Sequence, residues 1–172
     1  MRTIFVGDVV CVERFSKGWS GGLPETKCGA GSTLKNTEQQ RKWIPKIIEK
    51  YAIGSIADIG AGDLNWIREM DLSGVDYSAY DLVPRAKGVT QFNLVEQVAP
   101  RADMIMCLWV LNHLPMEDSR NAISNLKASG SKYLLMTDRP KWHSEQPDEI
   151  HMPHIEELVL NDRRDRLVLI EL

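Results

Sequence analysis

The chain has 172 residues, of which 43% are hydrophobic and 26% are charged, with a formal net charge of -3; this composition is typical of one soluble globular domain with a sizeable core. No stretch approaches the roughly 20 apolar residues that span a bilayer, and the N-terminus lacks the apolar core of a secretory signal, which favours a cytoplasmic location. Cys11, Cys28 and Cys107 lie at wide spacings that fit neither a disulfide framework nor a metal-binding CxxC pair, so reduced thiols are expected.

The N-terminal region predicts strands followed by a loop. Residues 3–12 are rich in β-branched side chains and are interrupted by Gly7 and Asp8, which indicates two short strands or a hairpin. Residues 16–33 are rich in glycine and predict a long irregular loop, a kind of segment that is usually functional or disordered. Residues 1–50 carry an excess of Lys and Arg, which either attracts an anionic substrate or belongs to a solvated helix face.

Helix and strand patterns alternate through the rest of the chain. A helix begins at Asn36 or Thr37, which suit an N-cap, and extends to about Tyr51; a second covers residues 117–128. Five strands are predicted at residues 55–60, 76–82, 89–94, 104–110 and 133–138. Two apolar runs within residues 156–171 predict an antiparallel hairpin that closes an edge of the sheet. This alternation is typical of a parallel sheet covered by helices.

The stretch SIADIGAGDLNW at residues 55–66 predicts a strand, a tight turn at Gly60 and Gly62, and a helix that begins near Leu64. In open α/β sheets, ligands bind at the carboxyl ends of strands near the point where strand order reverses, and this turn is expected there. Glycine suits such a turn because it tolerates positive φ and lets a ligand approach the backbone. A plain tight turn without a ligand gives the same pattern.

Two ligand classes compete for this turn. A dinucleotide fingerprint requires a third glycine where this chain has Asn65, and it places a pyrophosphate at a helix N-terminus, beside Asp63. A carboxylate there repels pyrophosphate and suits a cation, and Asp58 adds a second negative charge. These acids favour S-adenosylmethionine, which carries a sulfonium and an ammonium. Asp81, at the end of the next strand, is the candidate to bind ribose hydroxyls, although alone it is an ordinary strand-end aspartate.

Four segments, DIGAGDLNW, YDLVP, RADMIMCLWVLNHLP and SGSKYLLMTD, resemble in order and spacing the motifs of class I S-adenosylmethionine-dependent methyltransferases. The resemblance covers about residues 36–140 and is closest to a small, mostly uncharacterised bacterial and phage-like group. It implies an α/β fold with a Rossmann-like, doubly wound, mostly parallel sheet and a C-terminal antiparallel hairpin, in three α/β/α layers. It also implies S-adenosyl-L-methionine as cofactor, S-adenosyl-L-homocysteine as product, and a methyl acceptor that the sequence does not identify.

By position, the resemblance assigns the glycine turn to the methionine end of the cofactor, Asp81 to its ribose, the end of the third strand to its adenine, and the end of the fourth strand to the transferred methyl. Asn93 stands where the superfamily often has an acid, and its carbonyl still accepts a hydrogen bond from the adenine amino group. The candidate cofactor contacts are Asp58, Gly60, Gly62, Asp63, Asn65, Trp66, Asp81, Asn93, Leu94, Cys107 and Leu108.

The region after the fourth strand bears on the acceptor and the chemistry. Enzymes that methylate amino groups of DNA bases commonly carry an Asn/Asp-Pro-Pro-aromatic tetrad there, where this chain has Cys107-Leu108-Trp109-Val110. That difference, and the lack of a basic strip interleaved with aromatics, disfavour nucleic acid as acceptor. Methyl transfer is an in-line displacement for which alignment and desolvation can suffice. His113 is the candidate general base, and capping of the next helix is its alternative role.

The expected organisation is a single domain, with strands and a glycine-rich lid in residues 1–35 and the Rossmann-like core in residues 36–172. Within the lid, residues 16–33 are expected to order over the bound cofactor, with Trp19 as an apolar contact and Lys17 facing the acceptor.

The sequence predicts no metal site and leaves two alternative functions open. Three histidines after the fifth strand, His143, His151 and His154, do not have a spacing that specifies a metal site, and none is predicted. One alternative function is a catalytically silent S-adenosylmethionine-binding or partner protein. The other, an NAD-dependent oxidoreductase, is disfavoured by Asp63 and Asn65.

Overall fold

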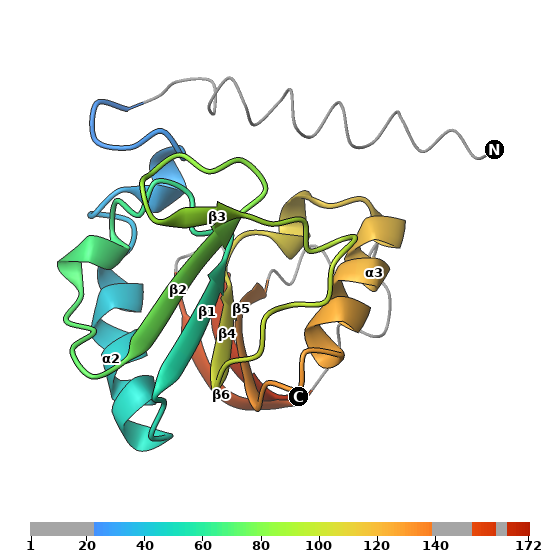
Figure 1. The fold of residues 1–172 in the computed structure, drawn as a ribbon. Coiled ribbons are helices and arrows are strands. Elements are labelled where there is room, and N and C mark those ends of the chain that lie inside the picture. The colour runs from blue at the N-terminus through green and yellow to red at the C-terminus, as the bar shows by residue number, and fades with distance from the viewer. Residues whose placement is uncertain (1–22, 139–152, 161–164) are drawn as a thin grey trace.

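The computed structural model describes residues 23–138, 153–160 and 165–172, whose centre is a seven-stranded sheet (Figure 1). The strands, in chain order, are Ser55–Ile59 (β1), Asp76–Asp81 (β2), Val89–Gln91 (β3), Met104–Cys107 (β4), Tyr133–Asp138 (β5), His154–Val159 (β6) and Arg166–Glu171 (β7). They lie side by side in the order β3-β2-β1-β4-β5-β7-β6. The first five are parallel, and β7 is antiparallel to both β5 and β6. The predicted parallel sheet with a C-terminal antiparallel hairpin at its edge is therefore confirmed.

The strand order reverses between β1 and β4. The chain passes from β1 to β2 and β3 on one side, then returns to place β4 on the other side of β1. Such a reversal leaves a crevice at the carboxyl ends of the two strands, because the connections leave in opposite directions. β4 and β5 are buried along their whole length, as expected of parallel strands covered on both faces.

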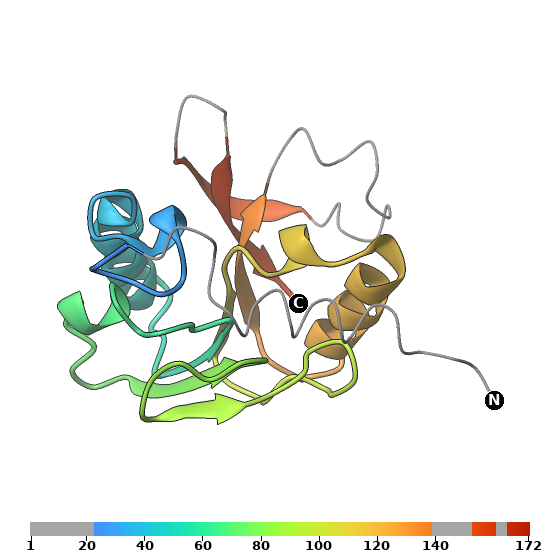
Figure 2. The same cartoon turned by 90° about the horizontal axis from the view of Figure 1, so that it is seen from above.

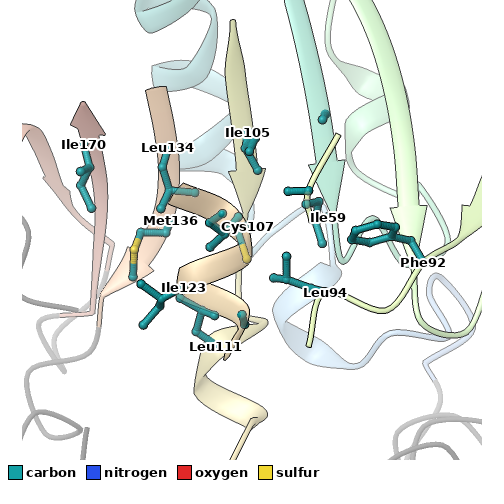
Figure 3. Packing of buried hydrophobic residues seen from close by; sticks show 14 of the residues in the cluster. Ile59, Phe92, Leu94, Ile105, Cys107, Leu111, Ile123, Leu134, Met136 and Ile170 are labelled. Carbon is teal, nitrogen blue, oxygen red and sulfur yellow. The ribbon is translucent and has the colours of Figure 1, made fainter. Parts of the chain in front are cut away.

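One α-helix among the described residues covers each face of the sheet, on opposite sides in Figure 2. Helix Glu38–Lys50 (α2) packs Ile44 and Ile47 against the face that includes Met104 and Met106. Helix Met116–Lys127 (α3) packs on the other face, where Ile123 lies near Cys107 and Met136 (Figure 3). Successive strand residues point to opposite faces, so the apolar run of β4 supplies both cores. This arrangement gives the three α/β/α layers expected.

The helix predicted after the glycine turn is absent, and this part of the expectation was wrong. Only a short 3-10 helix, Ile67–Glu69 (η2), follows the turn. Leu64 has a left-handed φ of 61°, and the Asp63 carboxylate accepts a hydrogen bond from the Asn65 backbone N–H. Side-chain bonds of this kind compete with helical backbone bonds. The turn therefore leads into an irregular segment.

Two strands end earlier than predicted. β3 ends at Gln91, because the Asn93 carbonyl oxygen then accepts the backbone N–H groups of Glu96 and Gln97 in a turn. β4 ends at Cys107, because Trp109 adopts a φ of 59° and the chain enters the 3-10 helix Leu111–His113 (η3). Both strands remain part of the parallel sheet.

Some predictions fall outside the described residues. These are the strands at residues 3–12, the first part of the glycine-rich loop at residues 16–22, including Lys17 and Trp19, and His143 and His151. A short 3-10 helix, Ala30–Ser32 (η1), belongs to the second part of that loop. Within the described part of the chain, no helix combines the length and the apolar content needed to cross a bilayer.

Candidate functional site

A cavity of about 960 Å³ lies at the carboxyl ends of β1, β2 and β4, where the strand order reverses. This volume is at the upper end of the range of small-molecule sites. Its walls come from the segments that follow β1, β2, β3 and β4, from residues 28–40, which precede and begin α2, and from Leu160 and Asp165. The predicted site residues that line it are Asp58, Gly60, Gly62, Asp63, Trp66, Asp81, Asn93, Leu94, Leu108 and His113. Ten predicted residues from four separate segments thus border one cavity.

The glycine turn is held closely by other parts of the protein. Gly60 and Gly62 have φ values of 89° and 61°, so both need the left-handed conformation that glycine adopts freely. A Cβ atom at Gly60 would overlap Cγ2 of Val110, and one at Gly62 would lie 2.6 Å from Sγ of Cys28. The close approach that the sequence suggested for a ligand is made here by protein atoms, and glycine is required by the fold itself.

Asp58 is a buried carboxyl at the end of β1, with 4% of its surface exposed. The Tyr77 hydroxyl donates a hydrogen bond of 2.6 Å to its Oδ2. Burial raises the pKa of Asp58 to about 7; the Tyr77 bond lowers it in part, and the Asp81 charge raises it further. The carboxyl is therefore partly ionised near neutral pH, and a cation beside it stabilises the ionised form.

Asp81 joins the end of β2 to the glycine turn. Its Oδ2 accepts the backbone N–H of Gly62 at 2.8 Å, and its Oδ1 accepts that of Val83 at 2.9 Å. An ionised carboxylate has about four acceptor positions, so each oxygen retains capacity for a ligand hydroxyl. Asp81 consequently braces the turn and also presents acceptor atoms at the cavity wall.

The fold of this chain is shared with solved methyltransferases. The chain matches the N-methyltransferase NodS from Bradyrhizobium japonicum WM9, solved with S-adenosyl-L-homocysteine, at a TM-score of 0.64 and 13% identity over 82% of this chain and 89% of that one. It matches magnesium protoporphyrin IX methyltransferase ChlM from Synechocystis PCC 6803, also solved with S-adenosyl-L-homocysteine, at a TM-score of 0.57 and 13% identity. That match covers 80% of this chain and 83% of ChlM. The methyltransferase domain of bacterial CtHen1-C matches at a TM-score of 0.58 and 12% identity, over 81% of this chain and 99% of that domain.

The chain has the class I methyltransferase fold. No protein-family model matches its sequence, and a search among curated proteins also gives no match. At these identities the chains share the arrangement of helices and strands, and the roles of the side chains follow from their own contacts.

Asp63 and Asn65, both predicted as cofactor contacts, hold the loop before α2. The Asp63 carboxylate accepts bonds from Thr26 Oγ1 at 2.8 Å and Lys27 N at 2.7 Å. Partial burial by itself would raise the pKa of Asp63, but these bonds and the Asn65 N–H outweigh it and lower the pKa. Asn65 Nδ2 donates to Glu25 Oε1 and to the Ser32 carbonyl, each at 2.9 Å, and Asn65 does not line the cavity.

Cys107 is also placed differently from the prediction. It points into the apolar cluster beneath α3, with 1% of its surface exposed, and it does not line the cavity (Figure 3). Burial raises the pKa of its thiol to about 12, as expected for a structural cysteine. The reason is the alternation of β4, in which Ile105 and Cys107 face α3. Leu108, one residue beyond the strand, reaches the cavity instead.

The adenine end predicted around Asn93 has a preformed turn. Asn93 Oδ1 accepts the Val95 backbone N–H at 3.0 Å, which leaves one further acceptor position on that oxygen. Leu94 is buried beside Phe92 in the core cluster and also lines the cavity (Figure 3). Trp66, predicted as a cofactor contact, lines the cavity and packs against the cluster beneath α2.

The segment after β4 carries strain at the cavity wall. Trp109 lines the cavity with a φ of 59°, a conformation that costs a bulky residue roughly 1–2 kcal/mol. Its backbone N–H donates a hydrogen bond of 3.2 Å to Thr137 Oγ1. Such strain persists mainly where function or surrounding structure requires it. His113, the candidate general base, is exposed on η3 at the same wall.

The sequence analysis missed several lining residues, two of which have an unpaired side-chain oxygen. Gln40 and Asn112 border the cavity, and each has a buried side-chain oxygen with no hydrogen-bond partner in the described structure. The sequence held a signal for Gln40, because it lies four residues before Ile44 on the apolar side of its helix, where an aliphatic residue is expected. Asn112 had no comparable signal.

The cavity has more acidic than basic side chains. Its carboxyl groups belong to Glu38, Asp58, Asp63, Asp81, Asp118 and Asp165, and its cationic side chains to Lys35 and Arg85. No group of metal-ligating side chains occurs within the described ranges. This excess of acids favours a ligand that carries positive charge.

Proposed function

We propose that the chain binds S-adenosyl-L-methionine and transfers its methyl group to an acceptor. The observation that carries the proposal is the meeting of the glycine turn, Asp58 and Asp81 at the carboxyl ends of β1 and β2. This occurs in a fold shared with NodS and ChlM, whose structures contain S-adenosyl-L-homocysteine.

The residues present fit this cofactor chemically. Asp58 offers a buried acid for the methionine ammonium, and Asp81 offers acceptor oxygens for ribose hydroxyls. Asn93 and Leu94 supply a polar and an apolar contact for the adenine. The acidic excess of the cavity suits the positive charges of the cofactor.

A dinucleotide fits less well. The fingerprint of NAD-binding proteins places a pyrophosphate at an α-helix N-terminus directly after the glycine turn. In the described part of this chain that turn leads only to η2, and Asp63 stands beside it as an ionised carboxylate. Repulsion between carboxylate and pyrophosphate disfavours that ligand.

The chain's own residues serve chiefly to position and desolvate the reactants. When bound, the cofactor supplies an electrophilic methyl group on a sulfonium. Asp58 and Asp81 fix the two ends of the methionine and ribose portion, and Leu108 and Trp109 exclude water from the wall after β4. His113 takes up the proton that the acceptor releases.

Calorimetry with S-adenosyl-L-homocysteine and with NAD tests the cofactor. We expect binding of the first and none of the second. Binding of NAD without a response to S-adenosyl-L-homocysteine would overturn the proposal. Once binding is established, consumption of S-adenosyl-L-methionine in the presence of acceptors distinguishes an enzyme from a catalytically silent binding protein.

A further inference from the structure

The buried side of α2 continues beyond the sheet into the cavity. Ile47, Ile44 and Gln40 follow one another at helical spacing, and all three are buried. Ile44 and Ile47 pack against the sheet, whereas Gln40 lies closer to the N-terminal end of α2 and borders the cavity with 3% of its surface exposed. A polar residue thus occupies a position whose burial favours an apolar one.

The Gln40 side chain has an unused acceptor. Its Oε1 is buried and receives no hydrogen bond from any residue that the structure describes, and the same holds for Oδ1 of Asn112 in the segment after β4. A buried acceptor without a donor destabilises a protein, so most such atoms are paired in native structures. Four buried side-chain atoms in the described structure lack a partner, and the two that are acceptors both belong to residues that border this cavity, where a ligand can supply donors.

The chemistry of these two oxygens limits the chemical class of the ligand that they can bind. A carboxamide oxygen accepts hydrogen bonds and carries no charge, so it binds N–H or O–H groups and does not bind a phosphate or carboxylate oxygen. The acidic excess of the cavity disfavours an anion further. A hydroxyl nucleophile has to lose the very hydrogen that the carboxamide would hold, and a carboxamide is not a base. A primary amine keeps its N–H bonds while its lone pair attacks.

We propose that Gln40 and Asn112 bind the N–H groups of an amine, and that the methyl acceptor of this chain is therefore a nitrogen; this rests on the proposed methyl transfer. As the N–CH₃ bond forms, the S–CH₃ bond breaks with its electron pair left on sulfur. The N–H proton of the resulting ammonium passes to His113 or to water. Gln40 and Asn112 are specificity-determining residues, since they touch the substrate and take no proton.

The substitution Gln40→Met tests the assignment, because methionine has a similar shape and no acceptor oxygen. Gln91→Met is the matched control, on the exposed edge strand β3 and outside the cavity wall. Each variant is melted without ligand, titrated with S-adenosyl-L-homocysteine, and then titrated in its saturated form with phenethylamine, 2-phenylethanol and phenylacetate, which share a ring and differ in the polar group.

We expect Gln40→Met to raise the melting temperature without ligand, to leave the S-adenosyl-L-homocysteine dissociation constant unchanged, and to weaken phenethylamine binding at least tenfold. The wild type and Gln91→Met should bind phenethylamine more tightly than the other two probes. A lower melting temperature for Gln40→Met, weaker S-adenosyl-L-homocysteine binding, or no preference for the amine would each overturn the assignment. Failure of the wild type to bind S-adenosyl-L-homocysteine would overturn the proposed function instead, whereas the melting comparison does not depend on the cofactor.

Discussion

The substitution Gly60→Ala should show whether the glycine turn is required by packing. An alanine Cβ there overlaps Cγ2 of Val110, whereas the next nearest atoms, Leu108 O and Val110 Cβ, stay at 3.8 Å. Val110 is β-branched, so its side chain has little freedom to rotate away. A left-handed φ costs alanine roughly 1–2 kcal/mol, and overpacking adds roughly 1–3 kcal/mol. We expect a loss of about 2–5 kcal/mol in the free energy of unfolding.

Two further variants separate these contributions. Gly88 has a φ of 92° and nothing within 4 Å of an added Cβ, so Gly88→Ala should show only the backbone cost of roughly 1–2 kcal/mol. In the double variant Gly60→Ala/Val110→Ala the overlapping methyl is gone, and the loss should be smaller than the sum of the single losses by about 1–3 kcal/mol.

The assay is urea unfolding monitored by fluorescence, with S-adenosyl-L-homocysteine calorimetry on each folded variant. Additivity of the Gly60→Ala and Val110→Ala losses would refute the steric reasoning. A Gly60→Ala variant as stable as the wild type that no longer binds S-adenosyl-L-homocysteine would show instead that the glycine serves the ligand.

Three other predictions concern charge and the lid. Because folding raises the pKa of Asp58 from 3.8 to about 7, its contribution to stability is full below pH 4 and is lost as pH rises through 7. Of a total loss of about 4 kcal/mol, about 2–3 kcal/mol falls between pH 5 and pH 8, and Asp58→Asn should remove this pH-dependent loss, measured by urea unfolding at these two pH values. A cofactor ammonium favours the ionised carboxyl, so the wild type should bind S-adenosyl-L-homocysteine roughly tenfold more tightly at pH 8 than at pH 6, a difference absent in Asp58→Asn. Asp81→Ala should weaken S-adenosyl-L-homocysteine binding by about 1–3 kcal/mol in calorimetry. It should also lower the melting temperature, because the Gly62 and Val83 N–H groups lose their acceptor. An unchanged dissociation constant would place the ribose elsewhere. Hydrogen exchange over residues 16–33 should slow on S-adenosyl-L-homocysteine binding, chiefly before residue 26, since the Thr26 N–H already donates to the Leu23 carbonyl and the Lys27 N–H to Asp63. Equal protection in both states would contradict a lid.

Much of the fold was predictable from local sequence patterns. Apolar runs bounded by turn residues gave the strands, and periodic apolar residues gave α2 and α3, because period and burial are properties of neighbouring residues. The glycine turn was recognisable for the same reason, since positive φ is a local requirement that Gly60 and Gly62 meet. Asp58 and Asp81 followed from their positions at strand ends.

The partners of the polar side chains were decided by tertiary structure alone. Asp63 receives its bonds from Thr26 and Lys27, and Asn65 binds Glu25, across separations of 36 to 40 residues that no local pattern records. Cys107 is the last residue of β4 and Leu108 is the next residue, so their side chains point to opposite faces of the sheet; Cys107 lies in the core beneath α3, and Leu108 reaches the cavity. The sequence by itself determined which segments form strands, helices and turns, because those depend on short-range periodicity and backbone preference. The cavity, the bonded state of its acids and the unpaired oxygen of Gln40 depend on which distant atoms come within hydrogen-bonding distance, and only the folded chain sets those distances.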